Sequence, residues 1–155
     1  MTGPAARLAE LGLELPAIAA PLGAYVPAVR SGSHVYVSGQ LPLADGKLSA
    51  TGKVGAEVSP EEAQRLAARC ALNALNALAA IDALVGLDAV VRVVKVTGFV
   101  ASAAGFTGQP GVLNGASDLF GEVFGPAGRH ARSAVGVAEL PLGAPVEVEV
   151  VVEVG

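Results

Sequence analysis

The segment that most constrains the fold is the run VEVEVVVEV near the end of the chain. Every second residue from Val146 to Val154 is valine, and three of the intervening positions are glutamate. Successive side chains of a strand point to opposite faces, so this run predicts a strand with one valine face and one mostly acidic face. The valine face needs an apolar layer to cover it, and helices of the same chain are the expected cover. The run therefore predicts a two-layer α+β architecture.

One long helix is available for that second layer. Residues 59–86 begin with Ser59 as N-cap and Pro60 in the first turn, and Glu62 completes a capping box. Gly86 is the expected end of the helix. Apolar residues at three- and four-residue steps predict one stripe facing the core. The stripe consists of Leu66, Cys70, Ala74, Ala77, Ile81 and Leu84.

The other elements follow from local patterns. Tyr25 to Ser38 is typical of a hairpin turning at 31–33, and a short helix is expected within the first fifteen residues. The predicted order is strand, strand, helix, strand, helix, strand, strand, with one sheet under two helices. The later elements are a strand at 89–101, a glycine-rich loop at 102–111, a helix near 112–124 and strands at 131–137 and 146–154.

Length and composition indicate one compact domain over residues 1–155, with 1–20 as an N-terminal extension. Glu10 and Glu14 interrupt the stretch where a signal peptide would need an apolar centre, so we expect a soluble cytoplasmic protein without membrane contact. Apolar residues make up 52% of the chain and charged residues only 15%. This balance favours homo-oligomerisation, which would cover apolar surface.

Several classes of function lack support. The net charge is −4 and no cluster of lysine and arginine occurs, so we do not expect nucleic acid as a partner. Nucleotide-binding and serine-hydrolase motifs are missing, and no cofactor is expected. His34 and His130 lie far apart without acidic or cysteine partners at ligand spacing, so no metal site is expected. Cys70 falls on the core stripe, where a thiol usually fills space.

Arg132 is unusual because it lies inside a predicted strand. Alternation places it on one face with Ala134 and Gly136, whose small side chains leave room beside the guanidinium. Arginine can hold a carboxylate through two parallel hydrogen bonds, so this position suits a carboxylate site. A cross-strand ion pair with Glu149 or Glu153 fits the pattern at least as well.

Three segments of the chain resemble a known protein family. GAYVPAVRSGSHVYVSGQLPL (23–43) and ARSAVGVAELPLGAPVEVEV (131–150), with LNGASDLFGEVFG between them, resemble the reactive intermediate deaminases. This is the Rid or YjgF-type family, also labelled endoribonuclease L-PSP or translation inhibitor. The resemblance covers nearly the whole chain from Tyr25. It implies a chorismate mutase-like fold with a mostly antiparallel six-stranded sheet and two helices on one face, in a homotrimeric barrel with clefts between subunits.

Carried over by position, the resemblance implies roles for five residues. Arg132 would hold the substrate carboxylate, Glu147 would lie near the attacking water, and Tyr25 would close the cleft. Ser38 and Asn114 match further substrate-binding positions of the family. In the family these residues come from two adjoining chains.

The implied reaction is hydrolysis of a small enamine or imine, such as 2-aminoacrylate and its tautomer 2-iminopropionate, to a 2-keto acid and ammonia without a cofactor. The chain departs from the family at Ala134, often cysteine in the best-known members, so only its backbone could contribute to binding. The proline commonly before the tyrosine is Ala24 here. The loop 102–111 is longer than usual and an N-terminal segment precedes Tyr25. These departures indicate a divergent branch.

Two other functions compete with deamination. One is a non-catalytic trimer that binds a small carboxylate metabolite in the same cleft. The other is the ribonuclease activity named in the older family label, and the acidic net charge argues against it.

Overall fold

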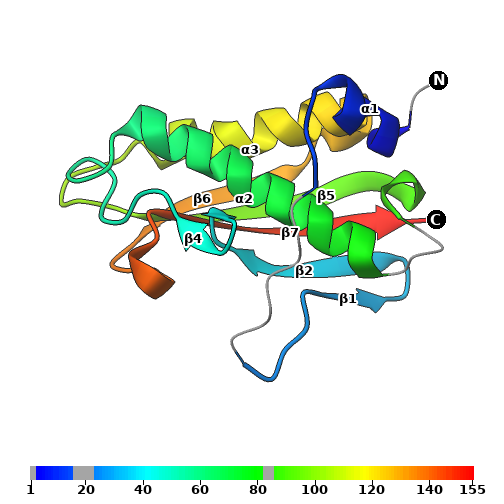
Figure 1. The fold of residues 1–155 in the computed structure, drawn as a ribbon, viewed down its shortest axis with the longest axis horizontal. Helices are drawn as coiled ribbons and strands as arrows, with labels where there is room; N and C mark the ends of the chain where they lie inside the picture. The colour runs from blue at the N-terminus through cyan, green and yellow to red at the C-terminus, as the bar shows by residue number, and fades with distance from the viewer. Residues whose placement is uncertain (1–2, 16–22, 82–85) are drawn as a thin grey trace.

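The computed structural model describes residues 3–15, 23–81 and 86–155. It contains one main sheet, a small two-stranded ribbon, and helices on one side of the sheet (Figure 1). The elements in chain order are α1 (Pro4–Glu10), β1 (Ala28–Ser31), β2 (His34–Gln40), β3 (Leu43–Ala44), β4 (Lys47–Leu48), α2 (Pro60–Ile81), β5 (Val90–Ala101), α3 (Gln109–Phe124), β6 (Ala131–Val137) and β7 (Val146–Val154), with short 3₁₀ turns η1 (Leu87–Ala89), η2 (Gly125–Gly128) and η3 (Pro141–Gly143).

The main sheet has the strand order β1-β2-β7-β5-β6. All neighbouring strands are antiparallel except β5 and β6, which run parallel. The mostly antiparallel α+β architecture is therefore confirmed. The main sheet has five strands within the described residues, whereas six were expected. The remaining extended segments, β3 and β4, are two residues each and pair with each other across the turn at Asp45 and Gly46. They are too short to reach the main sheet.

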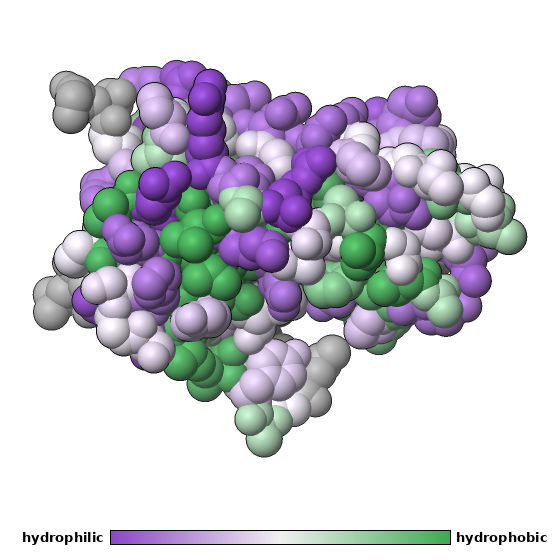
Figure 2. Space-filling model, turned by 180° about the vertical axis from the view of Figure 1, so that it is seen from behind, coloured by the Kyte–Doolittle hydropathy of each residue, from purple (hydrophilic) through white to green (hydrophobic). Residues whose placement is uncertain are grey.

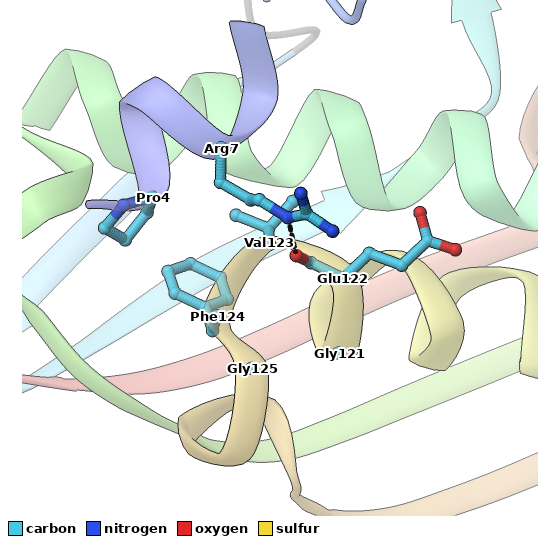
Figure 3. A pocket seen from close by; sticks show the side chains of 7 residues that line it. All are labelled: Pro4, Arg7, Gly121, Glu122, Val123, Phe124 and Gly125. Carbon is cyan, nitrogen blue, oxygen red and sulfur yellow. Dashed lines mark hydrogen bonds between the residues drawn. The ribbon is translucent and has the colours of Figure 1, made fainter. Parts of the chain in front are cut away.

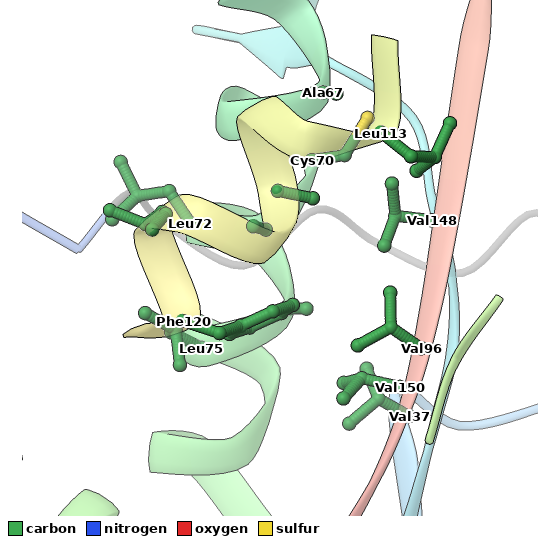
Figure 4. Close-up of a cluster of buried hydrophobic side chains, with 14 of the residues drawn as sticks. Val37, Ala67, Cys70, Leu72, Leu75, Val96, Leu113, Phe120, Val148 and Val150 are labelled. Atoms are coloured by element: carbon green, nitrogen blue, oxygen red, sulfur yellow. The ribbon is translucent and has the colours of Figure 1, made fainter. Parts of the chain in front are cut away.

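Helices α2 and α3 pack side by side on one face of the sheet, as predicted (Figure 1). Figure 4 shows side chains of both helices directed at valines of the sheet. Phe120 of α3 and Leu75 of α2 are fully buried between the layers, opposite Val96 and Val150. The alternate valines of β7 are all buried, so the run that predicted a second layer forms the centre of the core.

The start of α2 follows the predicted cap. The Oγ of Ser59 accepts a hydrogen bond from the backbone N–H of Glu62 at 3.1 Å. The Glu62 carboxylate is paired with Arg65 at 2.7 Å, one turn further along the helix. The hydrogen bond from the Glu62 N–H to the Ser59 side chain is thus present. The Glu62 side chain forms an ion pair on the helix surface instead of the reciprocal bond to the Ser59 N–H that would complete a capping box.

The predicted stripe on α2 is confirmed as far as the structure describes it. Leu66, Cys70, Ala74 and Ala77 are buried, whereas Leu84 and the side chain of Ile81 lie outside the description. α2 also buries residues beside the stripe because it packs against both the sheet and α3. α3 begins at Gln109 rather than near residue 112, with Pro110 in its first turn, and so takes up the end of the predicted loop.

The short helix predicted in the N-terminal extension is α1, which packs beside the C-terminal end of α3 (Figure 1). Leu8 is its buried residue, and Nε of Arg7 donates to the backbone oxygen of Glu122 at 3.0 Å. A pocket of about 330 Å³ lies between the two helices, with Pro4 near Phe124 (Figure 3).

The opposite face of the sheet has no covering layer within the described residues. Figure 2, seen from behind, shows hydrophobic side chains gathered among charged ones. Val29, Tyr36 and Val135 are exposed apolar residues on strands β1, β2 and β6, and the strand registers put all three on this open face. Among the described residues, no helix is both long and apolar enough to cross a bilayer.

Candidate functional site

Arg132 lies on β6, the last strand at one edge of the sheet. Its register partner on β5 is Val96, which is fully buried under the helices. Arg132 therefore faces the helix side of the sheet. Ala134 pairs with Gly98 and shares this face, as the alternation of the strand predicted.

The guanidinium of Arg132 is held by α3. Its Nη1 donates to Oδ1 of Asn114 at 2.8 Å and to Oγ of Ser117 at 3.1 Å. Asn114 and Ser117 are three residues apart and therefore lie on one face of the helix. Both acceptors are uncharged, so the guanidinium keeps its positive charge uncompensated by a carboxylate in this contact.

The predicted alternative, an ion pair of Arg132 with Glu149 or Glu153, is not present among the described residues. β5 separates β6 from β7, and the glutamates of β7 point to the open face of the sheet. The sequence pattern could not exclude this pair because it contains no information on strand order.

The remaining donors of Arg132 have the geometry that a carboxylate requires. Two N–H bonds of Nη1 are used by Asn114 and Ser117. Nε and Nη2 carry parallel N–H bonds along the other side of the guanidinium, and within the described part of the chain neither has a hydrogen-bond partner. Two parallel donors match the two oxygens of a carboxylate.

The small residues near Arg132 have a different role from the one expected. A Cβ on Gly98 would overlap the side chain of Leu113, and a Cβ on Gly136 would lie 2.9 Å from Nε2 of Gln109. The space over these glycines is therefore occupied by α3 and its N-terminal residue. Their small size lets α3 come close to the sheet edge, which brings Asn114 and Ser117 within reach of Arg132.

A second group of predicted residues lies around Glu147 on the open face. β2 has a bulge opposite β7, because the register shifts between Val37 and Gln40. Gly39 lies in this bulge and touches the Glu147 side chain so closely that a Cβ at Gly39 would overlap the carboxylate. The Ser-Gly-Gln segment thus provides a surface against which Glu147 rests.

Ser38 and Tyr25 are close to the same bulge. Oγ of Ser38 donates to the backbone oxygen of Val26 at 2.7 Å, and its N–H donates to the backbone oxygen of Pro27 at 2.8 Å. Both bonds attach the segment that carries Tyr25 to β2. Tyr25 itself precedes β1 and is 52% exposed.

Burial raises the pKa of the Glu147 carboxyl above its ordinary value, and the nearby charge of Glu149 raises the pKa further. A carboxyl group with a raised pKa exchanges protons more readily near neutral pH than an ordinary surface glutamate. Glu147 is thus suited to proton transfer to or from a water molecule.

The two groups of residues do not meet within one chain. Arg132, Asn114 and Ala134 are on the helix side at the β6 edge. Glu147 instead points to the open face near β2, where Ser38 holds the segment that carries Tyr25. A site that used both groups needs a second copy of the chain.

Ser117 was not identified from the sequence, and His130 was considered there only as a possible metal ligand. Oγ of Ser117 is 2.9 Å from Nε2 of His130, and Nδ1 of His130 is 2.6 Å from the backbone oxygen of Gly128. The position of Ser117, three residues after Asn114, was the available signal. This spacing becomes informative only when the strand with Arg132 is known to lie beside α3.

Two further features considered from the sequence are the Cys70 thiol and a possible metal site. Cys70 is fully buried, and burial raises the pKa of its thiol, as expected of a space-filling residue. In the described part of the chain, no three histidine, cysteine or acidic side chains gather as a metal site would require.

Comparison with known proteins gives a family. The family model described as "YjgF/chorismate_mutase-like, putative endoribonuclease" matches residues 5–154. Protein TCP17 of Trypanosoma cruzi is 52% identical over 150 residues, which cover 96% of this chain and 92% of TCP17.

Two solved structures extend the comparison. A crystal structure of a protein from Shewanella oneidensis, which carries the same endoribonuclease label, has a TM-score of 0.93 and 35% identity, covering 99% of this chain and 100% of its own. E. coli TdcF, solved with bound serine, has a TM-score of 0.58 and 26% identity, covering 87% of this chain and 91% of its own.

Proposed function

Because the chain belongs to the YjgF/chorismate mutase-like family, we propose that it hydrolyses a small enamine or imine acid to a 2-keto acid and ammonia. The observation that carries the proposal is the guanidinium of Arg132, anchored through Nη1 by Asn114 and Ser117 while Nε and Nη2 face no described partner. This arrangement suits the carboxylate of 2-iminopropionate or a similar imino acid.

The rest of the reaction would be performed by groups on the open face. Glu147, whose pKa is raised by burial, orients a water molecule beside the imine carbon. The water oxygen bonds to that carbon while the π pair of the imine moves to the nitrogen, and Glu147 passes the two protons of the water to the nitrogen in turn. The remaining carbon–nitrogen bond then breaks, the carbonyl forms, and the nitrogen leaves as ammonia. An imine carbon is already electrophilic, so a carboxylate anchor, a positioned water and a proton donor are sufficient, and the chemistry needs no cofactor.

Assembly is part of this proposal. Arg132 and Glu147 lie on opposite faces of one sheet, and a homotrimer with clefts between subunits would bring Arg132 of one copy to Glu147 and Tyr25 of another. The exposed apolar residues of the open face, Val29, Tyr36 and Val135, favour such an assembly because contact between copies would cover them.

The bound serine in the TdcF structure supports the substrate class, since serine is a small molecule with a carboxylate and a nitrogen on the neighbouring carbon. Ala134 takes the position at which the best-known family members often carry cysteine. In this chain its backbone would border the substrate, and no thiol takes part.

The decisive experiment is release of ammonia and keto acid from 2-aminoacrylate generated in the assay by a serine dehydratase, measured above spontaneous hydrolysis. Arg132→Ala should abolish the enzymatic excess while the oligomer persists in light scattering. Arg129→Ala is the matched control, because the Arg129 side chain is exposed and, within the described residues, only backbone atoms of Arg129 are hydrogen-bonded, to Pro126 and Arg92. A wild-type protein that accelerates hydrolysis of none of several imino acids would refute the proposal.

A binding protein without turnover is the second candidate, and the anchored guanidinium favours it equally. Thermal stabilisation by pyruvate that is lost in Arg132→Ala, without ammonia release from any imino acid, would establish it. The ribonuclease label of the family predicts RNA cleavage instead. With a net charge of −4, we expect RNA to remain intact after incubation with rigorously purified protein.

A further inference from the structure

His130 is connected to Arg132 through one hydroxyl group. Its ring lies edge-on to Phe120 with centroids 6.1 Å apart, and both ring nitrogens have partners. Nδ1 is 2.6 Å from the backbone oxygen of Gly128, and Nε2 is 2.9 Å from Oγ of Ser117. The same Oγ accepts from Nη1 of Arg132 at 3.1 Å. The ring is half-buried, so these bonds form away from bulk water.

The direction of each bond follows from what each atom can do. A carbonyl oxygen only accepts, so Nδ1 of His130 carries the proton that Gly128 accepts. In the ring that carries a single proton, at Nδ1, Nε2 is an acceptor, and the Ser117 hydroxyl donates its single proton to it. With that proton directed at His130, the lone pairs of Oγ remain turned toward Arg132.

We propose that His130 and Ser117 are positioning residues for the carboxylate site: His130 orients the Ser117 hydroxyl, and Ser117 together with Asn114 fixes Nη1 of Arg132. Fixing both N–H bonds of Nη1 sets the plane and rotation of the guanidinium. The parallel N–H bonds of Nε and Nη2 then point in one direction, where a planar carboxylate is held side-on.

This inference rests on the proposed function for the identity of the ligand, a small 2-imino or 2-keto carboxylate, but not for the state of Arg132 without ligand. A preorganised guanidinium loses less conformational freedom when the carboxylate binds. The pair of His130 and Ser117, here called the dyad, should therefore affect the affinity for the carboxylate more than the rate of the chemical step. Loss of the Ser117 hydroxyl should therefore raise KM and the Kd for a keto acid, with little change in kcat.

The first test needs no ligand. Nitrogen NMR of the wild-type protein should show a neutral His130 ring protonated at Nδ1, with His34→Gln separating the signals of the two histidines. The Nη signals of Arg132 should show slow rotation of the guanidinium. Rotation should become about tenfold faster in Ser117→Ala, and should return toward the wild-type rate in Ser117→Thr, which keeps a hydroxyl. A ring protonated at Nε2, or rotation unchanged in Ser117→Ala, would overturn the proposal.

The second test measures pyruvate binding by calorimetry and KM in the ammonia assay. Ser117→Ala should weaken binding about tenfold, and His130→Phe, which keeps an aromatic edge against Phe120, should weaken it less. The double variant should bind no worse than Ser117→Ala alone, because the histidine acts through the serine. Ser102→Ala is the matched control: this half-buried hydroxyl accepts from Gln109, away from Arg132, and its loss should leave pyruvate binding unchanged.

The outcomes separate this proposal from the deaminase assignment. A wild-type protein that binds pyruvate but releases no ammonia refutes deamination alone, and the NMR and binding differences still decide the dyad. Additive losses in the double variant, or wild-type affinity in Ser117→Ala, would refute the dyad while deamination stands.

Discussion

Gly115 of α3 lies directly against the backbone oxygen of Gln64 in α2, in a space that no side chain could share. Nε2 of Gln64 also donates to the backbone oxygen of Gly111 at 3.0 Å, so a hydrogen bond joins the two helices one turn before this contact. Gly115 is flanked by Asn114 and, two residues on, by Ser117. The tight contact at Gly115 therefore helps to determine where the residues that hold Arg132 are placed.

We expect Gly115→Ala to destabilise the fold by about 1–3 kcal/mol, because the added methyl group overlaps backbone that cannot move aside easily. The helices must separate, so pyruvate binding at Arg132 should weaken as well. Urea unfolding and calorimetry measure the two effects. Gly121→Ala is the control on the same helix: its Cβ would meet nothing within 4 Å, and removing a helical glycine should stabilise by up to about 1 kcal/mol. Equal stability of the two variants would contradict the prediction.

The raised pKa of Glu147 predicts how stability depends on pH. The folded state retains this proton at pH values where the unfolded state, near the ordinary value of 4.5, has lost it. Stability from this group is thus present at low pH and declines as pH rises from about 4.5 through the folded pKa. Glu147→Gln should therefore raise Tm at pH 7, leave it nearly unchanged at pH 4, and abolish ammonia release.

Glu149→Gln gives the matched comparison for that prediction. It removes the neighbouring negative charge and keeps the Glu147 carboxyl, so Tm at pH 7 should rise by less than in Glu147→Gln. If Tm in Glu147→Gln follows the wild-type pH dependence across this range, burial of Glu147 has no bearing on stability.

Gly39 should matter for turnover because its missing side chain leaves room for the Glu147 carboxylate. Gly39→Ala should push the carboxylate out of place and lower kcat by roughly 100-fold. Its backbone does not adopt a positive φ, so the alanine itself causes no backbone strain. Gly111→Ala, with nothing within 4 Å of the added Cβ, serves as the control. An unaltered kcat in Gly39→Ala would mean that this contact does not position Glu147.

The attachment of α1 to α3 should depend on apolar burial rather than on its ion pair. Leu8 is 4% exposed, and Leu8→Ala should cost about 2–4 kcal/mol. Arg7 pairs with Glu10 at the surface, so Arg7→Ala should cost less than about 1 kcal/mol, even with the loss of its bond to the Glu122 carbonyl. Urea unfolding of both variants tests the order. A larger loss in Arg7→Ala would show that the polar contacts dominate.

Patterns of period two and period 3.6 predicted the elements that form the site. The strands with Arg132 and Glu147 occupy residues 131–137 and 146–154 as expected, and the predicted second helix is present as α3. Local signals work here because each element buries one face, and burial of one face imposes a period on the sequence. These patterns indicated five strands, and the sixth was implied only by the family resemblance. Among the described residues β3 and β4 pair with each other and not with the main sheet.

The contacts of Arg132 could not be predicted in this way. The alternation of its strand showed which residues share its face, but not that β6 lies beside β5 and parallel to it. That arrangement excluded the pair with Glu149 or Glu153 and placed Ser117 and His130 beside the guanidinium.

The sequence by itself therefore determined the elements, their buried faces and the family, because these depend on neighbours along the chain. Tertiary structure alone decided that Arg132 is held by uncharged groups of α3 and that Glu147 rests on Gly39 across the other face. Both contacts join residues far apart in the chain, and strand order and helix distance create them. Neither strand order nor the distance between helix and sheet can be predicted from the periodicity of the sequence.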